Sequence, residues 1–434
     1  STPLSTGAPT NLPQANGNNI INVLRDLGQP LAAFNQGFGR NVSVSANRVF
    51  TGETKDYGFS GQIDYDFGGA TLTSITAYRQ YRSGQASDTD YGEVDILYRA
   101  PSDDAYRQFH TFTQELRLQG EAFDGKLDWL VGGFFANEKL TVRDNLRFGN
   151  QYGRFATCRI ISGGGLAGLY SPTSPACLGA RPAAFGAASP IVFAAFDRLD
   201  AMNNVGTTDD RYFQNGTNWA VFTHNIVHIT DTVDLTLGLR YTNDKKKFDA
   251  TFGNDNTVCT ANQAALSSFL TNPGLAAVAG GIIGLSCQGN STAELNGVSI
   301  RDDRKEDQIT GTAILSWKPV DDLLVYGSFA RGYKAGGFNL DRSALKSPIA
   351  SFASLGGAQA LVGSLQFDPE LVDSYEVGAK FSNGPFGLSV SAFRSDFSSF
   401  QLNTFNGTVF LVQNVNGCNS LVGGSGADTD LSNA

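Results

Sequence analysis

The chain has 434 residues, a net charge of −9, and 17% charged against 41% hydrophobic residues. A negative net charge provides no basic surface of the kind that nucleic-acid-binding proteins carry, so that class of protein is excluded. No run of about 18 apolar residues occurs, which excludes a transmembrane helix; a membrane β-barrel stays possible, because its apolar residues are spread over alternate positions of many strands.

The sequence predicts a succession of β-strands. In residues 233–242, for example, every second residue from Val233 to Tyr241 is apolar, and those between are polar or glycine. Such alternation places apolar side chains on one face of a strand and polar ones on the other. About eleven strands are expected by this pattern: 57–67, 71–81, 108–121, 126–144, 218–229, 233–246, 308–318, 323–333, 372–381, 387–400 and 408–415.

The connections between these strands alternate in length. The short ones lie at 67–70, 121–126, 229–233, 318–323 and 382–387, and the long ones at 82–107, 146–217, 247–307 and 335–371. A soluble sandwich has no reason to place every short connection at one end. An outer-membrane barrel does, since its periplasmic turns are short and its extracellular loops long. We therefore predict an all-β fold, an antiparallel transmembrane β-barrel with long extracellular loops.

The predicted barrel is partial. An odd number of strands leaves two bare edges, and a bare edge cannot face lipid. We expect residues 1–56 to be an extracellular loop or preceding-strand region, 57–415 the central part of the barrel, and 416–434 the start of a further extracellular loop. Neither a signal peptide nor the aromatic-terminated last strand of outer-membrane proteins is recognisable at the two ends.

Cysteine positions indicate the compartment. Cys158 and Cys177 fall in the second long connection, and Cys259 and Cys287 in the third. We predict a disulfide within each pair, which would contribute about 3 kcal/mol and requires an oxidising compartment; free thiols are the alternative. Cys418 is left unpaired within the chain. Metal ligation is not supported, because no C-x-x-C spacing or neighbouring histidine occurs.

Several segments resemble one family. Residues 326–339, YGSFARGYKAGGFN, resemble the most recognisable barrel motif of TonB-dependent outer-membrane receptors, and 112–118, 127–135 and 374–381 are similar to other barrel strands of that family. The motif residues singled out are Tyr326, Arg331, Gly332, Tyr333, Lys334, Gly336, Gly337, Phe338 and Asn339.

The resemblance implies a barrel of about 22 strands, of which this chain holds half. It further implies an N-terminal plug, which is missing ahead of residue 57, as are the final strands. The plug would contact the TonB–ExbB–ExbD complex, which drives uptake of a scarce solute. In the family that it resembles, the solute is most often siderophore-bound iron, with cobalamin or a saccharide as alternatives. A passive porin-like channel and a secreted β-rich adhesin or binding module are the rival functions.

Other motifs admit a functional and an ordinary interpretation. The glycines of 331–339 either bend the strand over the lumen or are structural only. Lys245, Lys246 and Lys247 either pair with lipopolysaccharide phosphates or form a solvated rim. His224 and His228 share a strand face but lie about 13 Å apart, too far to chelate one metal.

The long connections are the best place for ligand capture. Within them, residues 264–270 and 275–285 could form short helices. No residue set suggests catalysis, a cofactor or a metal site. We therefore expect a receptor rather than an enzyme, with outer-membrane lipid and lipopolysaccharide around it.

Overall fold

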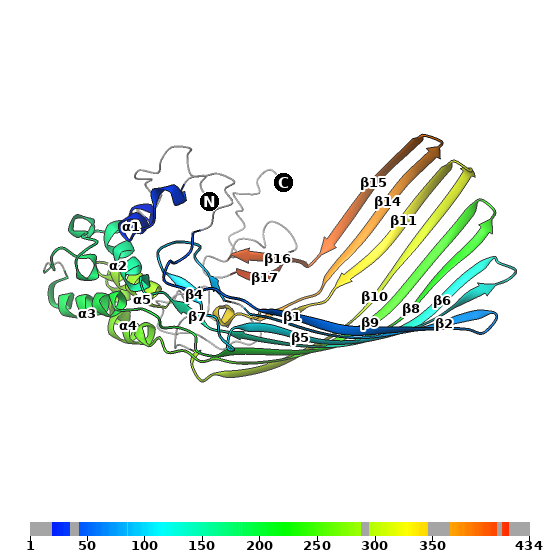
Figure 1. Ribbon diagram of the computed structural model, residues 1–434. Helices are drawn as coiled ribbons and strands as arrows, with labels where there is room; N and C mark the ends of the chain where they lie inside the picture. The colour runs from blue at the N-terminus through cyan, green and yellow to red at the C-terminus, as the bar shows by residue number, and fades with distance from the viewer. Residues whose placement is uncertain are drawn as a thin grey trace.

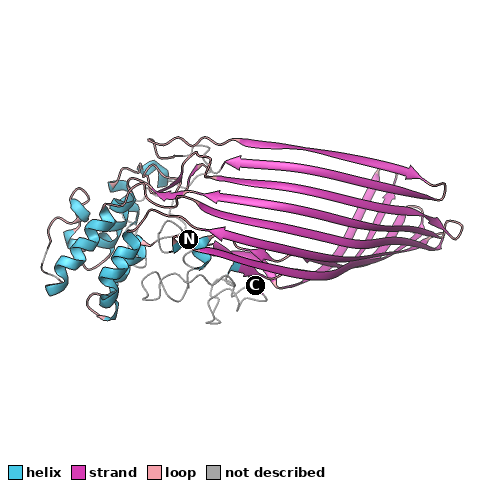
Figure 2. Ribbon diagram, turned by 90° about the horizontal axis from the view of Figure 1, so that it is seen from below, coloured by secondary structure: helices cyan, strands magenta, loops and turns pink. Residues whose placement is uncertain are grey.

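The computed structural model describes residues 20–34, 43–84, 86–181, 183, 185–287, 295–345, 365–405 and 410–415. These residues form a long curved antiparallel sheet with a group of helices beyond one end (Figure 1; Figure 2). The five short connections of the sheet lie at the end opposite to the helices. The sidedness predicted from the connection lengths is therefore present. Within the described ranges, no helix is long and apolar enough to span a membrane.

Ten strands make the main sheet in the order β1-β2-β5-β6-β8-β9-β10-β11-β14-β15. Ten of the predicted strands are thereby confirmed. The sheet is open, with β1 and β15 at its edges. Its strands are β1 (Thr54–Asp66), β2 (Ala70–Gly84), β5 (Tyr106–Ala122), β6 (Leu127–Asp144), β8 (Asp210–Thr230), β9 (Val233–Thr251), β10 (Ser299–Val320), β11 (Leu323–Lys334), β14 (Glu370–Asn383) and β15 (Phe386–Ser398).

Many strands are longer than predicted at the helical end. β10 has 22 residues and β8 has 21, whereas about 9–11 residues cross a bilayer. The extensions, 210–217 and 299–307, fall in the predicted long connections, and most of their side chains are polar or charged, with Tyr212, Phe213 and Ile300 as exceptions. Above the membrane both faces of a strand meet water or other loops, so the alternation that marks the lower part of the strand is lost.

The two faces of the sheet differ in polarity. One face carries exposed apolar side chains on many strands, such as Val131, Leu239 and Ile309. The register places Val131 and Leu239 on the same face, because both lie opposite Thr223 of β8. The other face carries charged and polar side chains, including the ion pair of Arg117 with Glu115. Exposed apolar residues spread over many strands of one sheet face are what a lipid-facing surface requires.

Aromatic residues mark two levels of the apolar face. Trp129 and Trp317 lie near the short turns, and Phe135 and Trp219 lie further up. From residue 129 to residue 135 the strand rises about 20 Å along its own axis, or about 15 Å along the membrane normal for a tilt of about 40°, which fits inside the apolar band of a barrel. Trp219 also packs against Tyr241, with 5.5 Å between ring centroids. Both aromatic levels therefore lie within one membrane band.

The eleventh predicted strand, 408–415, does not join the main sheet. Its described part forms β17 (Phe410–Val415), which pairs with β16 (Phe400–Phe405) in a separate hairpin inside the curve of the sheet (Figure 1). Ser399 has a φ of +54°, so the chain turns sharply after β15. The Asn414 side chain donates to the Ser399 carbonyl at 2.8 Å and fixes this turn. Strand patterning alone cannot distinguish such a hairpin from a barrel strand.

The long connections hold the helices and the small sheets. The described helices are α1 (Ile20–Asp26), α2 (Tyr152–Gly163), α3 (Ser189–Asp200), α4 (Val258–Leu266) and α5 (Ala276–Ser286), with 3₁₀ turns η1 (Leu31–Phe34), η2 (Ala167–Leu169), η3 (Pro175–Cys177), η4 (Gly186–Ala188), η5 (Ser267–Thr271) and η7 (Arg342–Leu345). The small strands are β3 (Ser87–Asp88), β4 (Leu97–Arg99), β7 (Leu146–Phe148), β12 (Gly337–Phe338) and β13 (Gln366–Phe367). Both predicted helical segments are present, the first divided between α4 and η5.

Candidate functional site

Helices α2 to α5, the helical cap, pack around one apolar core. Ile161 of α2, Phe196 of α3, Leu266 of α4 and Ile282 of α5 are all fully buried there. Residues of two long connections thus fold into a single unit beyond the sheet. Val23 of α1 is buried in the same core, so this part of the predicted 1–56 region lies on the cap.

Two disulfides staple the cap. Cys158 is bonded to Cys177 and Cys259 to Cys287, with Cα–Cα distances of 5.1 and 4.7 Å. These are the two pairs predicted from the sequence. Cys418 lies outside the described residues. Each bond restrains the loop that it closes. The shared apolar core, and not a disulfide, joins the two connections into one unit.

The motif at 326–339 ends β11 and begins a segment that folds back over the polar face. We call residues 335–345 the strap. Its Gly337 and Phe338 form β12, which pairs with β13. Phe338 is buried, and its ring stacks on that of Phe248 with 4.8 Å between centroids. Of the two interpretations of the glycines, the structure has the chain fold over the polar face at this point, and the strap packs against the inner face of β9.

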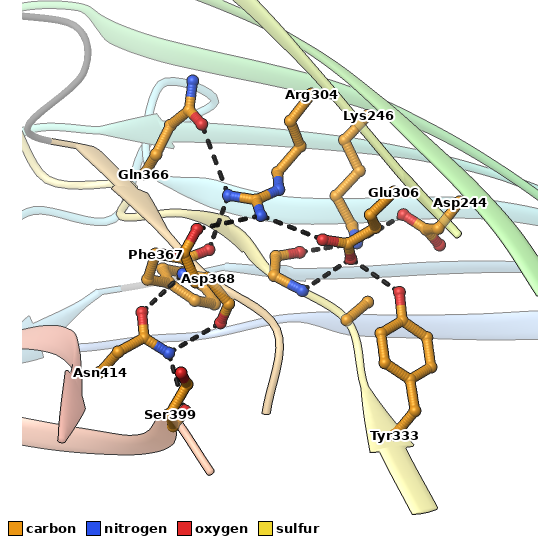
Figure 3. A network of polar contacts seen from close by, with 12 residues as sticks. Asp244, Lys246, Arg304, Glu306, Tyr333, Gln366, Phe367, Asp368, Ser399 and Asn414 are labelled. Atoms are coloured by element: carbon orange, nitrogen blue, oxygen red, sulfur yellow. Dashed lines mark hydrogen bonds and ion pairs between the residues drawn. The ribbon is translucent and has the colours of Figure 1, made fainter. Parts of the chain in front are cut away.

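Glu306 holds the start of the strap. Its Oε1 accepts hydrogen bonds from the Tyr333 hydroxyl at 2.7 Å and from the Gly336 N–H at 2.8 Å (Figure 3). The Gly336 carbonyl accepts a bond of 2.8 Å from Nζ of Lys246, which also lies 2.7 Å from Asp244. Both backbone groups of Gly336 are thus paired with charged side chains, which makes strong bonds.

Arg304 joins the strap to β13. Its Nη1 donates to the Phe367 carbonyl at 2.8 Å, and its Nη2 lies 3.0 Å from Oε2 of Glu306 (Figure 3). The side chains of this ion pair are only 11% and 8% exposed. A Cβ on Gly336 would lie 2.7 Å from the Arg304 guanidinium carbon and 2.6 Å from the Phe367 carbonyl oxygen. Glycine is therefore required at this position by close approach.

Other motif residues lie apart from this network. Arg331 points to the lipid-facing side, where its Nη2 lies 2.6 Å from Oδ2 of Asp373. Gly332 lies opposite Val372, and Lys334 is exposed at the end of β11. Tyr326 and its partner Glu376 form a hydrogen bond on the polar face. The motif therefore shapes the upper end of β11 and does not gather into one ligand-binding cluster.

The far part of the strap is anchored to other elements. The Asn339 side chain exchanges hydrogen bonds with the backbone of Val412 in β17, at 3.1 Å through its Nδ2 and 2.8 Å through its Oδ1. Arg342 makes an ion pair with Asp210 at the start of β8, and its N–H donates to the Tyr212 hydroxyl at 2.8 Å. The strap is thus held at its start, middle and end.

The three consecutive lysines of β9 divide between the two faces. Lys246 is the strap residue described above, whereas Lys245 and Lys247 are exposed on the lipid-facing side. The register sets Lys245 directly opposite Lys305 of β10, which is also exposed. The described residues offer these three lysines no carboxylate within ion-pair distance. Lys245 and Lys305 are like charges facing each other on adjacent strands, which is unfavourable without a counter-ion, whereas Lys247 lies opposite the exposed Asp303.

The two histidines behave differently. His228 lies between two carboxylates near a short turn, with Nδ1 2.7 Å from Asp234 and Nε2 3.2 Å from Asp128. His224 lies opposite Gly238. Among the described residues, no group of three or more possible ligands could hold a metal ion. The histidines are therefore part of the strand framework.

Sequence analysis missed Arg304, Glu306, Asp210 and Arg342. Residues 301–307 carry charges of both signs at the end of a predicted long connection, and this composition indicates only the root of a loop. The structure shows a strand in which Arg304 and Glu306 face inward and Lys305 outward. The spacing of two between Arg304 and Glu306 was the available signal, because it puts both on one face of a strand. No local signal marks Asp210 and Arg342, which are 132 residues apart.

Comparison with known proteins identifies the family. No curated protein matches the chain. Among solved structures, it is similar to the ferric yersiniabactin uptake receptor FyuA from Yersinia pestis, with 15% identity, a TM-score of 0.48, and coverage of 84% of this chain and 39% of that one. It is also similar to the ferric-catecholate import receptor Fiu from E. coli K12 in its closed form. The identity is 11% and the TM-score 0.44, with coverage of 92% of this chain and 47% of that one. The chain thus spans less than half the length of either receptor.

The family described as "TonB dependent receptor-like, beta-barrel" matches residues 4–420. This range includes the ten-stranded sheet, the helical cap and the strap. It is a family of receptors and transporters of the outer membrane, so the predicted location is confirmed. The chain belongs to the β-barrel family of TonB-dependent receptors.

Proposed function

We propose that the chain supplies barrel strands and extracellular loops to a TonB-dependent receptor that actively takes up a scarce solute. The family assignment across residues 4–420 is the observation that carries this proposal. The polar inner face of the sheet and the rigid cap beyond it fit a route for a solute. Siderophore-bound iron is the first candidate solute, because it is the most frequent solute of this family, and cobalamin and saccharides are the next candidates.

The strap supports an uptake role by its position. Residues 335–345 fold over the inner face above the membrane band, where a solute would enter. Energy would come from a TonB–ExbB–ExbD complex acting on a plug domain of the receptor. In this proposal the chain provides recognition and the passage, and the plug provides the coupling.

Uptake by cells tests the proposal. A strain deleted for the gene and its complemented parent are given radiolabelled ferric siderophores, cobalamin and maltodextrins, with and without a protonophore. We expect one solute class to accumulate only in the complemented strain and only without protonophore, while surface binding persists. Gene-dependent uptake that ignores the protonophore would favour a porin-like channel. Recovery of the protein in the aqueous fraction would favour a secreted adhesin.

We further propose that Lys245, Lys247 and Lys305 bind phosphates of lipopolysaccharide. Lys245 lies four residues above Tyr241, a distance of about 10 Å along the membrane normal for a strand tilted by about 40°. That height is above the apolar band, where the phosphates of the outer leaflet lie. Anionic groups would relieve the repulsion between Lys245 and Lys305.

A further inference from the structure

An apolar groove lies on the helical cap between α2 and α5. It has a volume of about 700 Å³. Its apolar wall is made by Ile160, Leu166, Phe185, Val278 and Leu285. All five side chains pack against the buried core of the cap while remaining partly exposed on their other side. The groove is therefore a lined depression of the folded cap and not a gap between separate loops.

The two disulfides hold both walls of the groove. Cys158 precedes the groove residues Arg159 and Ile160 in α2, and Cys287 follows Leu285 at the end of α5. Glycine keeps the space between the helices open. A Cβ on Gly281 would make only ordinary contact with Ile160, at 3.7 Å, so that position has room for a side chain but carries none. A groove with fixed walls needs little reorganisation to accept a ligand.

Arg159 is the charged side chain of the groove. Its Nε is buried and has no hydrogen-bond partner among the described residues. No carboxylate in that part of the chain lies within ion-pair distance, and the guanidinium sits 5.5 Å from the centroid of the Phe155 ring. Burial lowers the pKa of Arg159 below its usual range. A cation at an apolar wall without a counter-charge is costly, and a bound anion would remove that cost.

We propose that this groove binds a small amphiphilic anion from the medium, with its carboxylate or sulfonate group on Arg159 and its apolar body on the α2–α5 wall. Charge complementarity selects the anion, and the apolar lining selects the body. Because the cap lies beyond the strand ends, away from the membrane band, the ligand is a free solute and not a membrane lipid (Figure 1). The site does not depend on uptake, so binding is measured directly.

Three naphthalene probes of similar size test the charge preference. The purified receptor in lipid nanodiscs is titrated calorimetrically with 2-naphthoate, neutral 2-naphthalenemethanol and cationic 2-naphthylmethylammonium, and empty nanodiscs are subtracted. We expect naphthoate to bind best and the cation worst. The Arg159→Met variant should weaken naphthoate binding about tenfold or more, since a charge-assisted hydrogen bond is lost, and should leave the neutral probe unchanged.

Two further variants separate the groove from the rest of the cap. Gly281→Leu should fill the groove and weaken all three probes. Arg181→Met is the matched control, because Arg181 pairs with Asp197 outside the groove, and it should leave all three affinities unchanged. Peptide mapping of both disulfides verifies that each variant has folded. Equal binding of the three probes, no binding of naphthoate, or unchanged naphthoate affinity in Arg159→Met would overturn the proposal.

Discussion

Arg342 and Asp210 form an ion pair from which solvent is excluded. Nη1 of Arg342 lies 3.1 Å from Oδ1 of Asp210, and both side chains are 0% exposed. The same carboxylate oxygen accepts a bond of 3.1 Å from the Gly253 N–H. Arg342 belongs to the strap and Asp210 begins β8, so this pair fastens the strap to the upper edge of the sheet.

Breaking that pair should loosen the strap. Asp210→Asn keeps the shape but removes the carboxylate charge that faces the buried Arg342, and the loss of one partner of a buried ion pair typically costs about 3–5 kcal/mol. We expect faster hydrogen exchange in residues 335–345 than in the parent protein. Asp396→Asn is the control, because the Arg394–Asp396 pair is 78% and 50% exposed and such pairs contribute at most about 1 kcal/mol. Equal exchange in the two variants would contradict the anchoring role.

Removing a disulfide should open the cap. The Cys259–Cys287 bond closes a loop with a sequence separation of 28, and its loss should cost about 3–4 kcal/mol. We predict that Cys259→Ser/Cys287→Ser exposes α4 and α5 to protease on intact cells, whereas the barrel strands stay protected. Reduced wild-type protein provides the comparison. A cleavage rate equal to that of oxidised wild type would show that apolar packing alone holds the cap.

The segment around Asp90 should lose stability as pH rises. Burial, with a smaller contribution from neighbouring Asp88 and Asp95, raises the pKa of Asp90 to about 7, while a hydrogen bond from the Leu97 N–H opposes the shift. The unfolded segment loses this proton near pH ~4, whereas the folded one keeps it to about pH 7. The stability conferred at low pH therefore decreases from about pH 4 to pH 7.

Hydrogen exchange of residues 87–99 at several pH values, corrected for intrinsic rates, measures this effect. Asp90→Asn keeps an acceptor for the Leu97 N–H and should make the protection independent of pH over that window. Asp103→Asn is the control, because the Asp103 side chain is fully exposed. If the parent's protection does not fall with pH, Asp90 is ionised in the fold.

The lipopolysaccharide proposal predicts a change in bound lipid. The double variant Lys245→Gln/Lys305→Gln removes the two positive charges that face each other. It should lower the amount of lipopolysaccharide phosphate that co-purifies with the receptor. Lys126→Gln is the matched control, since Lys126 is exposed at the end of the short turn before β6, on the other side of the membrane. Equal phosphate in both variants would leave these lysines as a solvated rim.

The sequence predicted the membrane band well and the region above it poorly. In the band, lipid outside and a polar lumen inside impose strict alternation, so strands such as β9 are readable from Val233 to Tyr241. Above it, Arg304 and Glu306 are buried by the strap, a contact between distant segments that no local pattern encodes. The same reason hides Asp210 and Arg342, and it explains why β17 resembled a barrel strand.

The site was predicted only in part. The two disulfides followed from the placement of cysteines in two long connections, and the glycines Gly336 and Gly337 indicated a bend only as one of two interpretations. The helical cap did not, because α2 and α3 come from one connection and α4 and α5 from another, and their shared core exists only after folding. The groove beside Arg159 depends on that core and is likewise invisible in the sequence.

The central claim, a membrane-spanning sheet with its cap outside and its short turns in the periplasm, is tested most directly by cysteine labelling on intact cells. In a Cys418→Ser background, Gly168→Cys places a thiol on the cap, and Asp231→Cys places one in the turn between β8 and β9; both positions are exposed. A membrane-impermeant maleimide should label residue 168 in intact cells and residue 231 only after the outer membrane is opened. Labelling of residue 231 in intact cells, with residue 168 protected, would contradict the account.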